Sequence, residues 1–74
     1  MFGVDKDTLK RLRNEFPVGC TVELVRMDDL RAPPYGTKGT VLHVDDIGTV
    51  HVKWANGSSL GAAYGDDIIR RIDK

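Results

Sequence analysis

The spacing of the hydrophobic side chains changes at Pro17, and this change limits what the chain can fold into. Before Pro17, the residues Leu9, Leu12 and Phe16 recur at helical spacing. After it, apolar side chains occupy every second position, most regularly over residues 50–54, which is the spacing of strands with one buried face. The sequence therefore predicts one N-terminal helix followed by a mostly β domain.

The predicted helix covers residues 5–15 and begins at Asp5. Aspartate is a favourable N-cap because its carboxylate accepts hydrogen bonds from backbone N–H groups of the first helical turn. Pro17 ends the helix because it cannot continue the backbone hydrogen bonding. We therefore assign residues 1–16 to a helical segment and residues 17–74 to a β-barrel, which together form a single domain.

Five short strands are predicted after the helix. The first one, residues 20–27, has one regular apolar face, and Val25 and Met27 make its other face apolar too. We expect the helix to cover Val25 and Met27, because no other free apolar surface is available to do so. The remaining strands are predicted at residues 39–45, 49–54, 58–64 and 68–72.

The turn after Trp54 decides how the third and fourth strands pair. A two-residue turn would send Leu60 to the solvent face. A type I turn closed by a left-handed Gly57 keeps Leu60 on the buried face and sets Ala62 opposite Val50. Because register follows the hydrophobic pattern, we predict the bulged turn. Five short strands, a long first loop and this hairpin form the layout of a small SH3-like barrel, whose sheet closes on itself.

The charges of the chain cancel, with eleven Lys or Arg against eleven Asp or Glu. This removes the simplest argument for nucleic-acid binding, because proteins that bind nucleic acid commonly carry a large excess of basic residues. Cys20 is the only cysteine, so neither a disulfide nor a Cys-based zinc site is expected within one chain, and no cofactor is assigned. No apolar run approaches the ~20 residues of a membrane span, and the N-terminus lacks a signal-peptide pattern. We expect a cytoplasmic protein.

Four runs of the sequence resemble an uncharacterised family, number 4314 in the domain-of-unknown-function series. They are GCTVELVRMDD at 19–29, APPYGTKGTV at 32–41, VDDIG at 44–48 and WANGSSL at 54–60. The resemblance covers roughly residues 16–72 and implies an SH3-like fold, in small proteins of bacteria, phages and mobile elements. It brings no established activity and no catalytic residues. The chain departs from the family at Ala55, where an acidic residue is usual.

Aromatic residues at loop and strand ends suggest a ligand-binding groove. In an SH3-like barrel, the long first loop and the strand ends flank a common groove, where rings with a polar rim suit a peptide or another flat ligand. Trp54 also continues the buried face of its strand, which favours a place in the core. The candidate binding residues are Arg26, Asp28, Asp29, Tyr35, Trp54, Asn56, Ser58, Ser59 and Tyr64.

Three aspartate pairs, at 28–29, 45–46 and 66–67, lie in predicted turns. Oxygen-rich loops hold Ca²⁺ or Mg²⁺ in many proteins. Aspartate also favours turns, because its side chain bonds the backbone two residues further on. None of the pairs has the spacing of a calcium loop, so we prefer the turn role and assign no metal site. His43 and His51 are expected on the polar faces of their strands.

The leading hypothesis is a non-enzymatic binding module that binds a host protein or sequesters a small nucleotide-like ligand. The resemblance places it among phage or mobile-element accessory and counter-defence proteins. The alternative is a nucleic-acid-associated module, because residues 39–44 resemble the KOW motif. A basic helix face supports that alternative, with Lys6, Lys10, Arg11 and Arg13 as candidate residues. No nucleophile and base share a recognisable spacing, so no enzyme is expected. A homo-oligomer is an open alternative.

Overall fold

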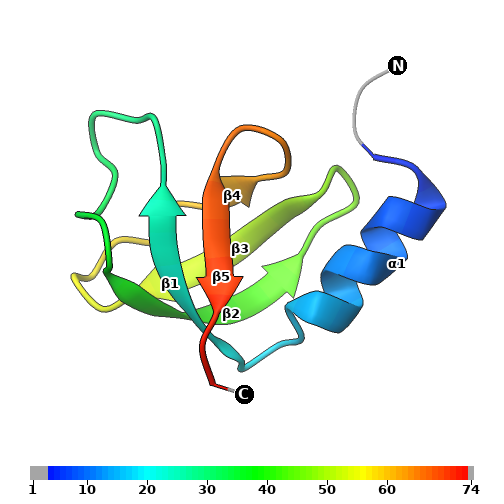
Figure 1. The fold of residues 1–74 in the computed structure, drawn as a ribbon, viewed down its shortest axis with the longest axis horizontal. Helices are drawn as coiled ribbons and strands as arrows, with labels where there is room; N and C mark the ends of the chain where they lie inside the picture. Colours follow the sequence, from blue (N-terminus) through cyan, green and yellow to red (C-terminus); the bar gives the residue numbers. More distant parts are fainter. Residues whose placement is uncertain (1–3, 74) are drawn as a thin grey trace.

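The computed structural model describes residues 4–73 and contains one helix and one antiparallel sheet (Figure 1). The strands are arranged in the order β4-β3-β2-β1-β5. This confirms the prediction of a mostly β protein with five strands and one N-terminal helix. No helix within residues 4–73 is long and apolar enough to span a membrane. The elements are α1 (Lys6–Glu15), β1 (Thr21–Arg26), β2 (Lys38–Val44), β3 (Thr49–Trp54), β4 (Ala62–Ala63) and β5 (Ile68–Arg71).

The sheet is open between its two edge strands, β4 and β5. These strands follow each other in the chain but do not pair with each other. The backbone N–H groups of Asp66 and Asp67 donate to the Ala63 carbonyl at 3.1 and 2.9 Å, which makes the link a tight turn. The Ala63 N–H donates to the Asp67 carboxylate at 2.9 Å. This backbone group of β4 is therefore paired with a side chain and not with a neighbouring strand. The closure into a barrel that the sequence predicted is therefore not found.

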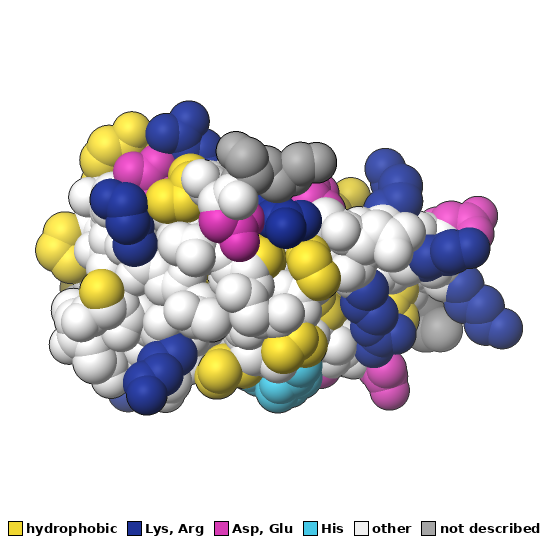
Figure 2. Space-filling view, turned by 90° about the horizontal axis from the view of Figure 1, so that it is seen from below, with side chains coloured by type: hydrophobic (Ala, Val, Ile, Leu, Met, Phe, Trp, Pro, Cys, Tyr) yellow, Lys and Arg dark blue, Asp and Glu magenta, His cyan; other side chains and the backbone are white. Residues whose placement is uncertain are grey.

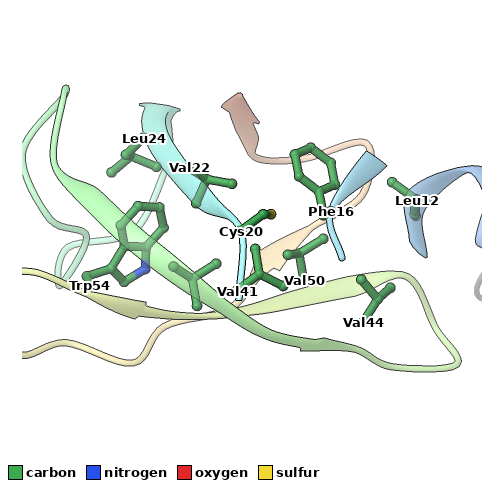
Figure 3. Packing of buried hydrophobic residues seen from close by; sticks show 10 residues of the cluster. Leu12, Phe16, Cys20, Val22, Leu24, Val41, Val44, Val50 and Trp54 are labelled. Carbon is green, nitrogen blue, oxygen red and sulfur yellow. The ribbon is translucent and has the colours of Figure 1, made fainter. Parts of the chain in front are cut away.

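The core lies on the concave face of β1, β2 and β3, where alternate side chains point inward (Figure 3). Val22, Val41 and Val52 are buried there, as the period-two pattern predicts. Trp54 is also in the core and is only 1% exposed. Its indole Nε1 donates to the Leu60 carbonyl at 2.9 Å, which satisfies the single polar group of the ring.

The helix begins at Asp5, whose carboxylate accepts a hydrogen bond from the Thr8 N–H at 2.7 Å. This hydrogen bond holds the pKa of Asp5 below its ordinary value. Leu12 on the helix and Phe16, its C-cap residue, extend into the core (Figure 3). The cap and the apolar stripe are therefore as predicted.

The predicted position of the helix is wrong. Helix α1 packs against β2 and does not cover the outer face of β1. The Arg13 guanidinium donates to the Val44 carbonyl at 3.1 Å and to the Asp46 carboxylate at 3.0 Å. Phe16 and Cys20 are both buried on the way into β1, which turns the helix toward the β2–β3 hairpin. Met27 is partly buried and packs against the core cluster.

The bulged turn predicted after Trp54 is confirmed. The Gly57 N–H donates to the Trp54 carbonyl at 3.0 Å, and the Trp54 N–H donates to the Ser58 carbonyl at 2.8 Å. Gly57 has a φ of 92°, which is the left-handed conformation that the turn requires. Val50 pairs with Ala62, as the hydrophobic pattern predicted.

The fourth strand is much shorter than the predicted 58–64. Only Ala62 and Ala63 pair with β3, because the Leu60 carbonyl turns toward the indole of Trp54 and leaves the ladder. A second irregularity lies in β2, where Leu42 is an extra residue between two pairs of the β2–β3 ladder. This bulge places His43 on the outer face of the sheet, next to His51.

Candidate functional site

A groove of about 500 Å³ lies between the start of the long β1–β2 loop and the segment that contains β4 and the β4–β5 link. We call it the acidic groove, because most of its charged side chains are aspartates. It is lined by Arg26, Met27, Asp28, Asp29, Leu60, Gly61, Ala63, Gly65, Asp66 and Asp67.

The loop wall of the groove is fixed by hydrogen bonds at both of its ends. The Leu24 N–H donates to the Thr37 carbonyl at 2.9 Å, and the Gly36 N–H donates to the Leu24 carbonyl at 2.8 Å. Near the groove, the Asp29 carboxylate accepts a hydrogen bond from the Arg31 N–H at 2.7 Å. The two ends of the loop and the turn at Asp29 are therefore fixed by hydrogen bonds, which lowers the conformational entropy that binding at this wall would cost.

The opposite wall is fixed against β3. The Ser58 hydroxyl accepts a hydrogen bond from the Leu60 N–H at 3.3 Å, while the Leu60 carbonyl is held by the indole of Trp54. Gly61 passes so close to β3 that a Cβ at this position would come within 2.6 Å of Thr49 Cγ2. Residues 60–61 therefore pack against β3 and also line the groove.

Two aspartate pairs that are far apart in the sequence, 28–29 and 66–67, line the same groove. The one cation in the lining is Arg26. Within residues 4–73, the carboxylates of Asp28 and Asp66 take part in no hydrogen bond or ion pair. A cluster of negative charges repels an anionic ligand and attracts a cationic one.

The predicted turn role, a bond to the backbone two residues further on, is found for Asp29 and Asp45 but not for Asp67, which binds the N–H of Ala63. Asp29, Asp45 and Asp67 each accept a hydrogen bond from a backbone N–H. Over the described part of the chain, no three His, Cys, Asp or Glu side chains converge in a way that could hold a metal ion.

Only three of the predicted binding residues line the acidic groove, namely Arg26, Asp28 and Asp29. Trp54 is corrected to a core residue, because its buried ring has no surface to offer a ligand. Tyr35 is 78% exposed outside the groove lining, and Tyr64 lines hollows on the other side of the β4–β5 link.

The polar side chains of Asn56 and Ser58 stabilise the β3–β4 turn itself by accepting hydrogen bonds from its backbone. The Asn56 side-chain oxygen accepts a hydrogen bond from the Ser58 N–H at 3.0 Å, and Ser59 is exposed outside the groove lining.

Two residues that line the groove, Asp66 and Asp67, were missing from the predicted set. The sequence feature that could have identified them is the aspartate pair itself. It was assigned to a turn and was not expected to lie near the pair at 28–29.

The four basic residues predicted on the helix do not form one patch. Lys6, Lys10 and Arg13 line a shallow hollow of about 260 Å³ on α1, and Lys and Arg side chains gather over this end of the molecule (Figure 2). Arg11 lies apart from them, with its guanidinium 3.4 Å from the Thr8 hydroxyl. Arg13 is already held by Val44 and Asp46 on the β2–β3 hairpin.

The outer face of the β2–β3 hairpin carries two stacked histidines, His43 and His51, with ring centroids 4.3 Å apart (Figure 2). His51 Nε2 lies 2.8 Å from Asp45 Oδ2, and Asp45 Oδ1 accepts hydrogen bonds from the N–H groups of Ile47 and Thr49. Burial by itself would raise the pKa of Asp45. The hydrogen bonds from His51, Thr49 and Ile47 outweigh burial and hold this pKa below its ordinary value.

The lowered pKa of Asp45 predicts how stability depends on pH. A carboxyl group with a lower pKa in the folded state contributes stability above its unfolded pKa of about 3.9, and this contribution is lost as pH falls through the folded pKa. Asp45→Asn is therefore expected to lower stability at neutral pH and to reduce the loss of stability in acid. Urea unfolding at a series of pH values measures both effects.

Asp28→Asn is the matched control for this experiment, because the Asp28 carboxylate has no hydrogen-bond partner among residues 4–73. As an exposed substitution, it is expected to change stability at neutral pH by less than about 0.5 kcal/mol. If Asp45→Asn lost stability in acid as steeply as the native protein, the role assigned to the Asp45 carboxylate would be wrong.

Comparison with known families gives one match. The model of a family described as "Domain of unknown function (DUF4314)" matches residues 5–72, which include α1 and all five strands. Neither a curated protein nor a solved structure matches the chain.

Proposed function

The chain belongs to the DUF4314 family, and we propose that it is a non-enzymatic binding module whose acidic groove binds a cationic segment of a partner protein. The observation that carries the proposal is the meeting of the aspartate pairs 28–29 and 66–67 on one groove of about 500 Å³. A groove of this volume falls within the range of pockets that enclose small ligands or a few side chains.

The same charges argue against the nucleotide-like ligand considered from the sequence. A phosphate group in the groove would face four aspartates and only one cation, Arg26. Arginine and lysine side chains of a partner have the complementary charge, and their apolar stems suit the contacts offered by Met27 and Leu60. A protein partner is therefore the better match to the chemistry of the groove.

A binding role also agrees with the kinds of residue that line the groove. Catalysis of acyl or phosphoryl transfer uses a nucleophile beside a base, or donors aimed at a developing negative charge. The charged side chains of the lining are carboxylates that repel such a charge, together with Arg26. The buried Cys20 is on another part of the fold, and burial raises the pKa of its thiol, which makes it a poor nucleophile.

We infer further that the sheet is an open form of the SH3-like barrel. The meander from β1 to β4, with β5 returning beside β1, supports this assignment. So does the long first loop followed by the tight hairpin after β3. The link between β4 and β5 brings the two sheet edges near each other, as a nearly closed barrel requires.

Neutralising the groove is expected to weaken binding of a cationic peptide. Isothermal titration with a short lysine- and arginine-rich peptide should give an affinity that falls about two- to five-fold for Asp28→Asn and again for Asp66→Asn, the usual range for exposed ion pairs. The affinity should also fall as salt is added. Asp7→Asn on α1 makes the same change of charge outside the groove lining and should leave the affinity unchanged.

A second candidate function is nucleic-acid binding through the hollow formed by Lys6, Lys10 and Arg13. Parallel titrations with a DNA duplex and an RNA strand distinguish it from the first. Binding of either nucleic acid that is lost in Lys10→Gln, together with no binding of the cationic peptide, would favour this second function and refute the first.

A further inference from the structure

A second, mostly apolar hollow lies on the other side of the β4–β5 link from the acidic groove. It has a volume of about 250 Å³ and occupies the opening between β4 and β5. Its walls include Leu12 from α1, Phe16 just after α1, Val50 from β3 and Ile69 from β5. We call it the seam crevice, because it exists only where the sheet fails to close.

The charged side chains that line the seam crevice, Glu15 and Asp67, are both negative. One Asp67 oxygen already accepts a hydrogen bond from the Ala63 N–H. Glu15, in contrast, takes part in no side-chain hydrogen bond or ion pair within residues 4–73. The crevice therefore combines an apolar interior with a carboxylate that has no partner of its own.

Glu15 also occupies an electrostatically unfavourable position at the end of the helix. It is the last residue of α1, and the partial negative charge at a helix C-terminus favours cations and disfavours carboxylates. Arg13 in the same turn points away from it, to Val44 and Asp46 on β2–β3. Glu15 is exposed at the rim of the crevice, so its carboxylate is accessible to a cation that enters there.

We propose that the seam crevice binds a small organic amine, a molecule with a short apolar body and an ammonium group. The apolar body fits between Leu12, Phe16 and Ile69, and the ammonium group pairs with the Glu15 carboxylate at the rim. The crevice is smaller than pockets for drug-sized ligands, which favours a compact molecule over a peptide. The two hollows share Ala63, Gly65 and Asp67, but Asp28 lines only the acidic groove and Glu15 only the seam crevice.

The test uses three probes with the same apolar chain, namely hexylamine, hexanol and hexanoate. Amide chemical shifts of the full protein are followed as each probe is added. Hexylamine is expected to shift the amides around Leu12–Phe16 and Ile68–Ile69, and to bind about three- to five-fold more tightly than hexanol, the range for one ion pair at a partly exposed site. Hexanoate is expected to bind more weakly than hexanol.

Glu15→Gln separates this site from a merely apolar hollow. The variant should bind hexylamine no more tightly than hexanol, while its melting temperature rises slightly because an unfavourable charge at the helix end is removed. Asp7→Asn, in the first turn of α1 and outside the lining of both hollows, should bind hexylamine as the native protein does. Equal binding of amine and alcohol by the native protein, an unchanged amine affinity in Glu15→Gln, or no shift around the crevice would each overturn the proposal.

Discussion

Replacing Trp54 with alanine is expected to lower the free energy of unfolding by about 3–5 kcal/mol, the usual cost of removing a buried tryptophan. The Trp54 side chain is almost completely buried and packs among Val22, Leu24 and Val41 (Figure 3). A core of this size supplies only about 3–5 kcal/mol of net stability in a domain of fewer than about 80 residues. The variant should therefore be largely unfolded at room temperature, as seen by circular dichroism.

Trp54→Phe keeps the prediction testable if the alanine variant does not fold. It retains an aromatic ring but loses the hydrogen bond from the indole Nε1 to the Leu60 carbonyl. Its urea unfolding midpoint should fall between those of the native protein and Trp54→Ala. Tyr35→Ala removes an exposed aromatic side chain and should change stability by less than about 0.5 kcal/mol. A Trp54→Ala protein as stable as Tyr35→Ala would contradict the assignment of Trp54 to the core.

Gly39→Ala is expected to have the next largest effect. Gly39 pairs with Trp54 across the β2–β3 ladder, and the absence of a side chain makes room for the indole. An added Cβ would lie 2.5 Å from Val52 Cγ1, 2.8 Å from Trp54 Cε3 and 3.0 Å from the Lys53 carbonyl. Two of these neighbours are buried side chains and the third is backbone, so the loss should be about 1–3 kcal/mol, as for other overpacked cores.

Gly61→Ala is the matched comparison for Gly39→Ala. Its added Cβ would also meet a neighbour at short range, Thr49 Cγ2 at 2.6 Å, but its next neighbour lies 3.6 Å away. Rotation of one threonine side chain can relieve this contact, so Gly61→Ala should lose less stability than Gly39→Ala. Chemical unfolding of both variants gives the comparison. A Gly39→Ala protein that is the more stable of the two would contradict the close packing of Gly39 against Trp54.

The elements of the fold that depend on local chemistry could be predicted from the sequence. The cap at Asp5, the alternation over 50–54 and the left-handed turn at Gly57 each follow from residues adjacent in the chain. The position of α1 did not follow, because it depends on where Leu12 and Phe16 are buried in the assembled core. The length of β4 did not follow either, because the indole of Trp54 competes with the ladder for the Leu60 carbonyl.

The candidate site could be predicted only in part, for the same reason. The sequence placed Arg26 near the end of the first strand and Asp28 and Asp29 on the loop after it, and these residues line the acidic groove. It did not bring the pair at 66–67 to the same groove, because that meeting depends on how β4 and β5 are linked at the open edge of the sheet. The seam crevice was missed because the predicted barrel was closed.

The measurement that most directly tests the binding role of the acidic groove is a map of amide chemical shifts during titration with the lysine- and arginine-rich peptide. We predict shifts at residues 26–29 and 60–67, which form the two walls of the groove. Amides of the outer β2–β3 face, such as those of His43 and His51, should stay unchanged. Shifts confined to α1, or none at saturating peptide in low salt, would contradict the proposed role.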